Sequence, residues 1–116
     1  MNATDRVRTE LLIGAVFRLL AGRRTIAVGN SSPIPGAAAL LLRAKNRDTR
    51  VLMLGSRRHN AFTDGGRELF DCAARGRIDA FFLGGGQIDG EGNINLVGLG
   101  PYPNITHRFP GSFGST

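Results

Sequence analysis

Three consecutive glycines follow an apolar segment in the last third of the chain. Gly84, Gly85 and Gly86 come directly after residues 78–83, which have the pattern of a buried strand, and Gln87 follows them. Because glycine has no side chain, the backbone N–H groups of this segment can point into a cleft, and a ligand oxygen can approach them closely. The alternative interpretation is structural, since three glycines also permit a sharp turn out of a sheet.

A second glycine-containing segment lies nearer the N-terminus. Residues 25–28 predict a short buried strand, residues 29–36 are rich in glycine, serine and proline, and residues 37–43 predict a helix. A loop between a strand and a helix presents free N–H groups at the helix N-terminus, where an anionic ligand group is favoured. The alternative is a tight crossover whose path the two prolines fix. The spacing matches neither the GxGxxG nor the GxxxxGKT type of phosphate-binding loop.

The other reactive side chains are isolated in the sequence. Cys72 is the only cysteine, so we expect a small buried residue in a reducing compartment. Neither His59 nor His107 has a histidine, cysteine or acidic neighbour at metal-ligand spacing, so no metal site is predicted. His59 lies near the end of a predicted strand, where it is either a general base or an ordinary loop histidine.

The charge balance is basic, with 15 Lys and Arg against 9 Asp and Glu, a net charge of +6. A basic chain raises the possibility of nucleic-acid binding. However, the arginines are scattered, and aromatic residues are 7% of the chain and do not alternate with arginines as a base-stacking surface requires. We therefore expect solvated surface cations and no nucleic-acid partner.

The length of 116 residues predicts a single domain over residues 1–116. Hydrophobic residues make up 41% of the chain, as in ordinary globular proteins. No segment reaches the roughly 20 apolar residues that span a bilayer. The apolar run at residues 11–17 also lacks the basic leader of a secretory signal. We expect a cytoplasmic protein without membrane contact.

Helix and strand patterns alternate through residues 4–83. Residues 4–21 predict an amphipathic helix, whose apolar positions recur at Val7, Leu11, Ala15 and Leu19, with Leu12, Val16 and Leu20 beside them. Further strands are predicted at residues 51–54 and 78–83, and a further helix at residues 66–75. This order predicts the α/β class, with a three-layer α/β/α arrangement around a mostly parallel sheet.

Parallel strands end at one edge of their sheet, and ligands of open α/β sheets bind at that edge. The predicted edge consists of residues 29–32, 54–56 and 84–87. After it, residues 87–89 and 94–97 flank a turn rich in glycine and asparagine and predict a β-hairpin. Residues 98–116 contain turn formers and have no helical period.

The segment FFLGGGQIDGEGNINLVGLGPYPNITHRFPGS, from Phe81 to Ser112, resembles the β subunits of family I CoA-transferases of the glutaconate CoA-transferase type. Those subunits carry a Gly-Gly-Ala-Gln-(Ile/Val)-Asp segment, a Tyr-Gly-Asn-(Val/Ile)-Asn turn and a basic, proline-containing stretch. Residues 84–89, 91–95 and 108–112 match these in order, and residues 28–37 resemble the family's first strand and turn. Because the family's β subunits are considerably longer, the chain resembles an N-terminal portion of one.

The resemblance implies an enzyme subunit whose substrate is a coenzyme A thioester, without a separately bound cofactor. The implied partner is a CoA-transferase α subunit of the same fold class. It also implies that Gly84, Gly85, Gly86 and Gln87 form an oxyanion hole for the thioester carbonyl. The residues assigned to substrate or CoA binding are Gly29, Asn30, Ser31, Ser32, Gly55 and Ser56. Arg57 and Arg58 could contact CoA phosphates, although they match no motif position.

The family's nucleophile is a glutamate at the end of the second strand, and Leu54 occupies that position here. A leucine side chain cannot attack a thioester, whereas a carboxylate can. Three hypotheses remain open: a subunit of a CoA-transferase, a subunit of a ring-opening CoA-thioester hydrolase whose attacking group comes from elsewhere, and a catalytically silent subunit that binds or scaffolds its partner.

Overall fold

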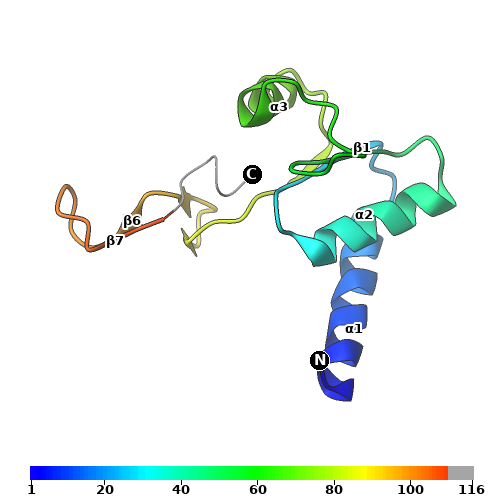
Figure 1. Ribbon diagram of the computed structural model, residues 1–116, viewed down its shortest axis with the longest axis horizontal. Coiled ribbons are helices and arrows are strands. Elements are labelled where there is room, and N and C mark those ends of the chain that lie inside the picture. Colours follow the sequence, from blue (N-terminus) through cyan, green and yellow to red (C-terminus); the bar gives the residue numbers. More distant parts are fainter. Residues whose placement is uncertain (110–116) are drawn as a thin grey trace.

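The structure, a computed structural model, describes residues 1–109. The helices are α1 (Ala3–Leu19), α2 (Pro33–Lys45) and α3 (Gly65–Ala74), and the first strands are β1 (Thr25–Val28), β2 (Arg50–Met53) and β3 (Ala80–Phe82) (Figure 1). Four short strands follow: β4 (Gln87–Ile88), β5 (Ile94–Asn95), β6 (Gly98–Leu99) and β7 (His107–Arg108). Helices and strands alternate as far as β3, as the sequence pattern predicts.

The three longer strands form one parallel sheet in the order β2-β1-β3. Val28 at the end of β1 pairs with Met53 of β2 on one side and with Phe82 of β3 on the other. All three strands therefore end together, which confirms the predicted parallel sheet and its common edge.

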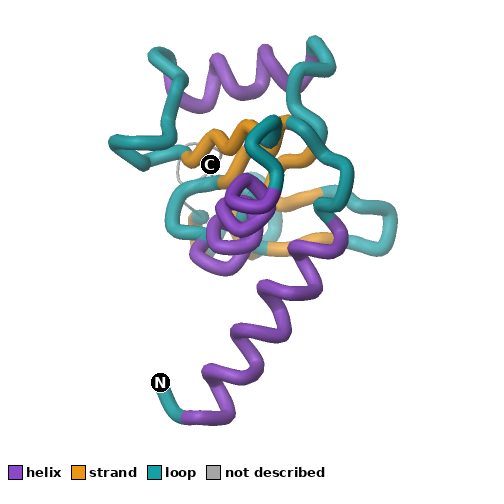
Figure 2. The backbone as a smooth tube through the Cα atoms, turned by 90° about the vertical axis from the view of Figure 1, so that its right-hand side faces the viewer, coloured by secondary structure: helices purple, strands orange, loops and turns teal. Residues whose placement is uncertain are grey.

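Helices cover both faces of this sheet, which gives three layers (Figures 1 and 2). On one face, Ile26 and Val28 pack against Ala38 and Ala39 of α2. Residues of α1 complete this part of the core. The complete burial of Ile26 and Val28 stabilises the fold by roughly 1.5–3 kcal/mol per side chain.

The opposite face of the sheet packs against α3. Ala27 and Leu52 contact Leu69, which is fully buried. Phe70 of α3 meets Phe81 of β3 edge to face, with ring centroids 6.1 Å apart. Neighbouring residues of a strand thus pack against opposite helical layers, because successive side chains of a strand point to opposite faces.

The N-terminal helix buries only part of the apolar face that the sequence predicts. Leu11 is 69% exposed and Leu19 is 78% exposed. The residues that pack on the core lie at i, i+3, i+4 and i+7: Ile13, Val16, Phe17 and Leu20. The first half of α1 projects away from the other layers (Figure 1). The prediction is right for Val16 and Leu20 and wrong for Leu11 and Leu19, because both sides of this helix are apolar and periodicity cannot distinguish them.

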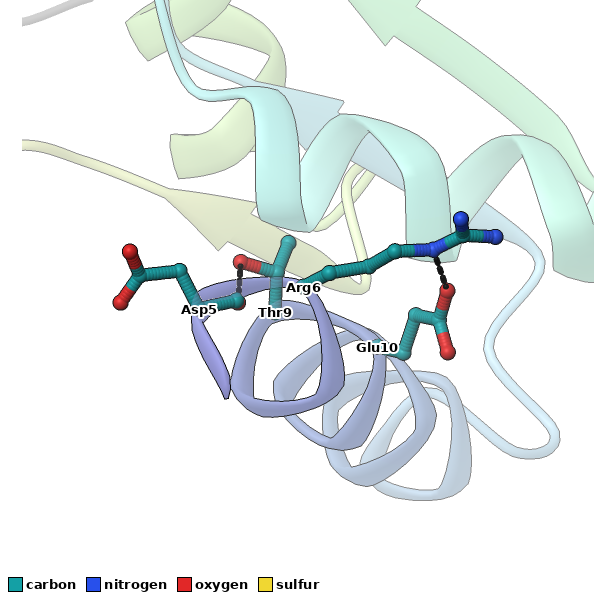
Figure 3. Close-up of polar contacts among 4 residues, drawn as sticks. All are labelled: Asp5, Arg6, Thr9 and Glu10. Atoms are coloured by element: carbon teal, nitrogen blue, oxygen red, sulfur yellow. Dashed lines mark hydrogen bonds and ion pairs between the residues drawn. The ribbon is translucent and has the colours of Figure 1, made fainter. Parts of the chain in front are cut away.

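Local polar contacts stabilise the projecting half of α1. The Asn2 side chain caps the helix by accepting a hydrogen bond from the Asp5 N–H at 2.8 Å. Arg6 Nε lies 2.9 Å from Glu10 Oε1, and the Thr9 hydroxyl donates to the Asp5 carbonyl at 2.8 Å (Figure 3). An exposed ion pair at i,i+4 contributes about 0.3–0.5 kcal/mol, so these contacts support the helix locally.

The second helix begins four residues before the predicted start, at Pro33. Proline suits the first position of a helix, because that position needs no N–H donor and the ring presets the helical φ. Gly36 then donates to the Ser32 carbonyl at 3.0 Å, which closes the first turn. The loop after β1 is therefore limited to residues 29–32.

Residues 87–108 form two small antiparallel hairpins that extend away from the layered body (Figure 1). In the first, β4 pairs with β5 and Gln87 lies opposite Asn95, which confirms the predicted hairpin. In the second, β6 pairs with β7 and Gly98 lies opposite Arg108. The sequence analysis missed this hairpin. Within residues 1–109, no helix combines the length and the apolar character that crossing a membrane requires.

Candidate functional site at the strand-end edge

The loop after β1 lies in the middle of the strand-end edge. The N–H of Gly29 donates to the Phe82 carbonyl at 2.9 Å, which connects this loop to the end of β3. The N–H of Leu54 donates to the Val28 carbonyl at 3.0 Å, which connects the end of β2. These bonds bring the ends of the three strands together at this edge.

Ser31 has a left-handed backbone with φ of 55° and is the only non-glycine residue of positive φ within residues 1–109. This conformation costs an ordinary residue roughly 1–2 kcal/mol, and such strain concentrates at ligand-binding positions. The hydroxyl of Ser32 donates to the Asn30 carbonyl at 3.4 Å and makes no capping bond to α2. The conformation of the loop therefore determines the geometry of both serines.

The start of α2 offers few donors to an anion. Pro33 and Pro35 have no N–H, and the N–H of Gly36 is bonded to Ser32. Of the four N–H groups that an ordinary helix start leaves free, at positions 32–35 here, the prolines at 33 and 35 therefore remove two. This finding favours the crossover interpretation of the proline-containing segment over a strong anion site at the helix N-terminus.

The loop after β2 is packed against the loop after β1. Gly55 has φ of 77°, and a Cβ atom there would lie 2.6 Å from Oδ1 of Asn30. Only glycine fits this left-handed position beside the asparagine side chain without strain. The hydroxyl of Ser56 accepts hydrogen bonds from the N–H groups of Arg58 and His59, at 3.3 and 3.1 Å. The Ser56 hydroxyl therefore stabilises the turn formed by residues 56–59.

Leu54 lies in the hydrophobic core. It is 8% exposed and packs with Ala27, Leu52 and Leu69 on the α3 side of the sheet. The position that the resemblance assigns to the family's nucleophile is thus surrounded by hydrocarbon, and its side chain has no chemical role at the edge.

The glycine segment after β3 is exposed, and part of it is used by the first hairpin. The N–H of Gly86 donates to the Asn95 carbonyl at 3.0 Å, and the Gln87 side chain accepts from the Asn95 side chain at 2.8 Å. Among the bonds formed within residues 1–109, none uses the N–H of Gly84 or Gly85. Among the three glycines, Gly84 and Gly85 therefore keep their N–H groups available, whereas the Gly86 N–H is bonded.

Packing also requires glycine at two of these positions. A Cβ atom on Gly85 would overlap the Ile94 side chain, and one on Gly86 would overlap the ring of Phe109. The glycines therefore allow the hairpin to fold closely against the segment that leaves the sheet. This structural role and an oxyanion role for Gly84 and Gly85 are compatible.

The polar residues of the matched motif hold the hairpin together. Asp89 accepts from the Asn93 side chain at 2.8 Å and from the N–H groups of Glu91 and Asn93 at 2.9 Å. These bonds, that of the Asn93 side chain foremost, lower the pKa of Asp89. The last motif residues, Pro110, Gly111 and Ser112, lie outside the described part of the chain.

Two further carboxylates have backbone partners. Asp79 accepts from the N–H groups of Thr25 and Arg24, both at 2.8 Å, and these bonds lower its pKa. Glu68 accepts from the N–H groups of Asp64 and Thr63, which lower its pKa in the same way. Both carboxylates thus serve as backbone acceptors at the start of a strand or helix.

The cysteine and the two histidines make contacts that do not involve the glycine segment after β3. Cys72 is a half-buried residue of α3, and His107 stacks edge to face on Phe109. Nδ1 of His59 lies 3.3 Å from Nη1 of Arg43. Residues 1–109 contain no group of three or more His, Cys, Asp or Glu side chains arranged to hold a metal ion.

Comparison with solved structures identifies the fold. No protein-family model matches the chain, and no curated protein matches it. The decarboxylase AibA/AibB matches with a TM-score of 0.71 and 26% sequence identity over 91% of this chain, as does a variant of it in which valine replaces a cysteine. The chain spans 52% of the matched chains. It therefore has the α/β fold of a CoA-transferase-like protein, as its glycine motif predicts.

Proposed function

We propose that the chain is a subunit, or part of a subunit, of a CoA-transferase-like enzyme that binds an acyl-CoA thioester together with a second subunit. The observation that carries this proposal is the match to AibA/AibB over 91% of the chain. The name of that decarboxylase gives two components, which supports an assembly of two subunits here.

The chemistry would centre on the two available amides after β3. Gly84 and Gly85 follow β3, where the chain leaves the sheet at the edge at which the three strands end, and their N–H groups are free of bonds within residues 1–109. Two backbone donors directed at a thioester oxygen stabilise the negative charge that develops there during reaction. Gly84 and Gly85 are therefore our candidates for the oxyanion site, and Gly86 is better assigned to the hairpin.

The position of Leu54 favours a reaction without an enzyme-bound acyl intermediate. Transfer through a glutamyl intermediate needs a carboxylate that reaches the substrate, and Leu54 is a core residue. Hydrolysis by an activated water requires only a polarised carbonyl on this subunit. Decarboxylation, the activity named for AibA/AibB, also uses a polarised thioester when the electrons left by CO2 move onto its oxygen.

A second candidate function is that of a silent subunit that only binds its partner. The observation that favours it is the exposed apolar stripe of α1, in which Val7, Leu11 and Leu19 follow one another at intervals of one or two helical turns. Contiguous exposed apolar surface of this kind marks interaction sites. A silent subunit would use this stripe without binding acyl-CoA.

Calorimetric titration with acetyl-CoA and with its thioether analogue S-ethyl-CoA tests the proposal. The thioether lacks the carbonyl, so a site that contacts the thioester oxygen should bind acetyl-CoA several-fold more tightly. Gly84→Pro removes one N–H donor and should abolish this preference, whereas Gly84→Ala keeps the donor and should retain it.

The outcomes separate the two candidate functions. Equal binding of thioester and thioether would refute the oxyanion role of Gly84. Absence of binding to either compound, with the partner subunit present, would overturn the acyl-CoA proposal and support the silent subunit. Release of free CoA without an acceptor acid would identify hydrolysis.

A further inference from the structure

A cavity of about 760 Å³ runs along the outer edge of β2. This strand pairs with β1 on one side only. Thr25 and Arg50, the first residues of β1 and β2, line the cavity, whereas the candidate acyl-CoA site lies at the opposite ends of the strands. The loop after β2 also lines the cavity, through Arg58 and His59, so the cavity, which we call the β2 crevice, extends along the whole outer edge of β2.

Four arginines from different elements line the β2 crevice: Arg43, Arg50, Arg58 and Arg77. Glu68 is the only acidic residue in the lining, and one of its oxygens already accepts backbone N–H bonds at the start of α3. The lining thus carries a surplus of three positive charges.

No carboxylate within residues 1–109 forms an ion pair with these arginines. Within residues 1–109 the only ion pair joins Arg6 and Glu10 on α1. Arg43 instead points toward the Nδ1 atom of His59, 3.3 Å away, a contact that requires this nitrogen to be unprotonated. A second hollow, which shares Arg43 and His59, adds Arg47 to the same basic surface.

A backbone donor also faces the β2 crevice. The N–H groups of Arg50 and Leu54 point toward the β1 side, whereas that of Met53 points outward to the His59 carbonyl. Because N–H groups alternate in direction along a strand, the N–H of Val51 points outward as well. Val51 is 4% exposed and lines the cavity, so this buried donor is directed at whatever occupies it.

The inner wall of the β2 crevice is apolar. Leu52, Phe62 and Ile78 line it and belong to the core cluster beneath α3. A volume of this size lies within the range of small-molecule sites, which combine apolar walls with a few polar groups. The crevice can therefore hold an aromatic or aliphatic group beside an anion.

The helix dipole alone does not explain this arrangement. A cation in the last turn of a helix is stabilised by the helix C-terminus, which accounts for Arg43 in α2. Arg50 begins β2, Arg58 lies in a loop and Arg77 precedes β3. Their convergence with Arg43 on one cavity requires a different reason, and a bound anion supplies one.

We propose that the β2 crevice binds a phosphate-bearing ligand of nucleotide size, with its phosphates on the arginines and its base against the apolar wall. Arginine guanidinium groups form paired, charge-assisted hydrogen bonds with phosphate oxygens. This proposal is independent of acyl-CoA chemistry at the strand-end edge.

Calorimetric titration of the full chain with ADP, inorganic pyrophosphate and adenosine tests the proposal. We expect ADP and pyrophosphate to bind, ADP more tightly, and adenosine to bind at least tenfold more weakly than ADP. The double variant Arg50→Gln/Arg58→Gln should weaken ADP binding roughly 100-fold, because each lost guanidinium contact costs about tenfold. The control Arg8→Gln/Arg67→Gln makes the same charge change outside the crevice and should leave the affinity unchanged.

Two measurements keep the result interpretable. Urea midpoints show whether each variant is folded, and Phe62→Ala, which keeps every charge, should weaken ADP binding but not pyrophosphate binding. Displacement of ADP by coenzyme A but not by pantetheine would identify the nucleotide half of coenzyme A as the ligand, and resistance to both would identify a separate nucleotide. Equal losses of ADP affinity in the crevice and control double variants, or none in either, would overturn the proposal.

Discussion

Replacing Leu54 by glutamate restores the residue type that the family resemblance places at this position. The structure predicts that this change destabilises the chain instead of activating it. Leu54 is 8% exposed and contacts Ala27, Leu52 and Leu69. A glutamate there would place a carboxylate among aliphatic side chains, on the far side of the β2 backbone from α2.

The expected loss is large. Removing a buried leucine side chain costs roughly 2–5 kcal/mol, and an ionised carboxylate in its place adds a desolvation penalty of several kcal/mol. The sum approaches the whole stability of a domain, which is about 5–15 kcal/mol. Burial raises the pKa of such a carboxyl, so the folded state binds more protons than the unfolded state and the penalty decreases as the pH falls.

Urea unfolding at pH 7 and pH 5 measures this effect. Leu54→Met conserves the side-chain volume and should cost less than about 1.5 kcal/mol at both pH values. Leu54→Gln has the shape of glutamate without the charge, so it should be more stable than Leu54→Glu at pH 7, with a smaller difference at pH 5. If Leu54→Glu unfolds at the wild-type midpoint at both pH values, the side chain of residue 54 faces solvent. The reasoning from burial would then be refuted, and residue 54 would lie in the cleft, as the family resemblance implies.

Three other predictions follow from particular contacts. Gly55→Ala and Gly65→Ala should each lower the free energy of unfolding by roughly 1–2 kcal/mol, because both positions have positive φ. Gly55→Ala should be the more destabilising, because its Cβ meets an asparagine side chain. Equal urea midpoints would contradict this contact. Leu11→Ala should change the stability by less than about 0.5 kcal/mol, whereas Leu20→Ala should cost roughly 2–5 kcal/mol, and a reversed order in thermal melts would restore the predicted face of α1. Because hydrogen bonds lower the pKa of Asp79, the folded state binds fewer protons than the unfolded state, so stability should fall as the pH drops below about 4; an acid profile that Asp79→Asn leaves unchanged would contradict this.

The order of the elements could be predicted because each strand is a short apolar run bounded by turn residues. The strand at residues 25–28 has the predicted bounds, and the helices at α1 and α3 match within two residues. Parallel pairing then follows from the alternation of strands and helices. These features depend on local patterns that are present in the sequence itself.

Other features depend on contacts between distant residues. The buried face of α1 is decided by where α2 lies, since leucines occur on both sides of the helix. The pairing of Gly98 with Arg108 across a proline-containing turn has no strand pattern in the sequence. Periodicity cannot predict either feature, because nothing in the local pattern separates the alternatives.

The candidate site shows the same division. Topology correctly placed the three loops at one edge, but the number of available donors depended on details of pairing. The Gly86 amide is used by Asn95, nine residues later, and Pro33 and Pro35 remove two donors from the start of α2. A prediction based on glycine and proline content alone overestimates the donors that the edge presents.

These departures have a common consequence for function. The strand-end edge keeps its backbone geometry and two available amides, while Leu54 is a core residue and the Gly86 amide is bonded within the first hairpin. An edge of this kind can polarise a carbonyl but cannot form a covalent acyl intermediate. The uncompensated charges lie instead along the outer edge of β2, where four arginines meet one glutamate. Under the proposed function, the chain would therefore bind and polarise its ligand, and residue 54 would not supply the nucleophile.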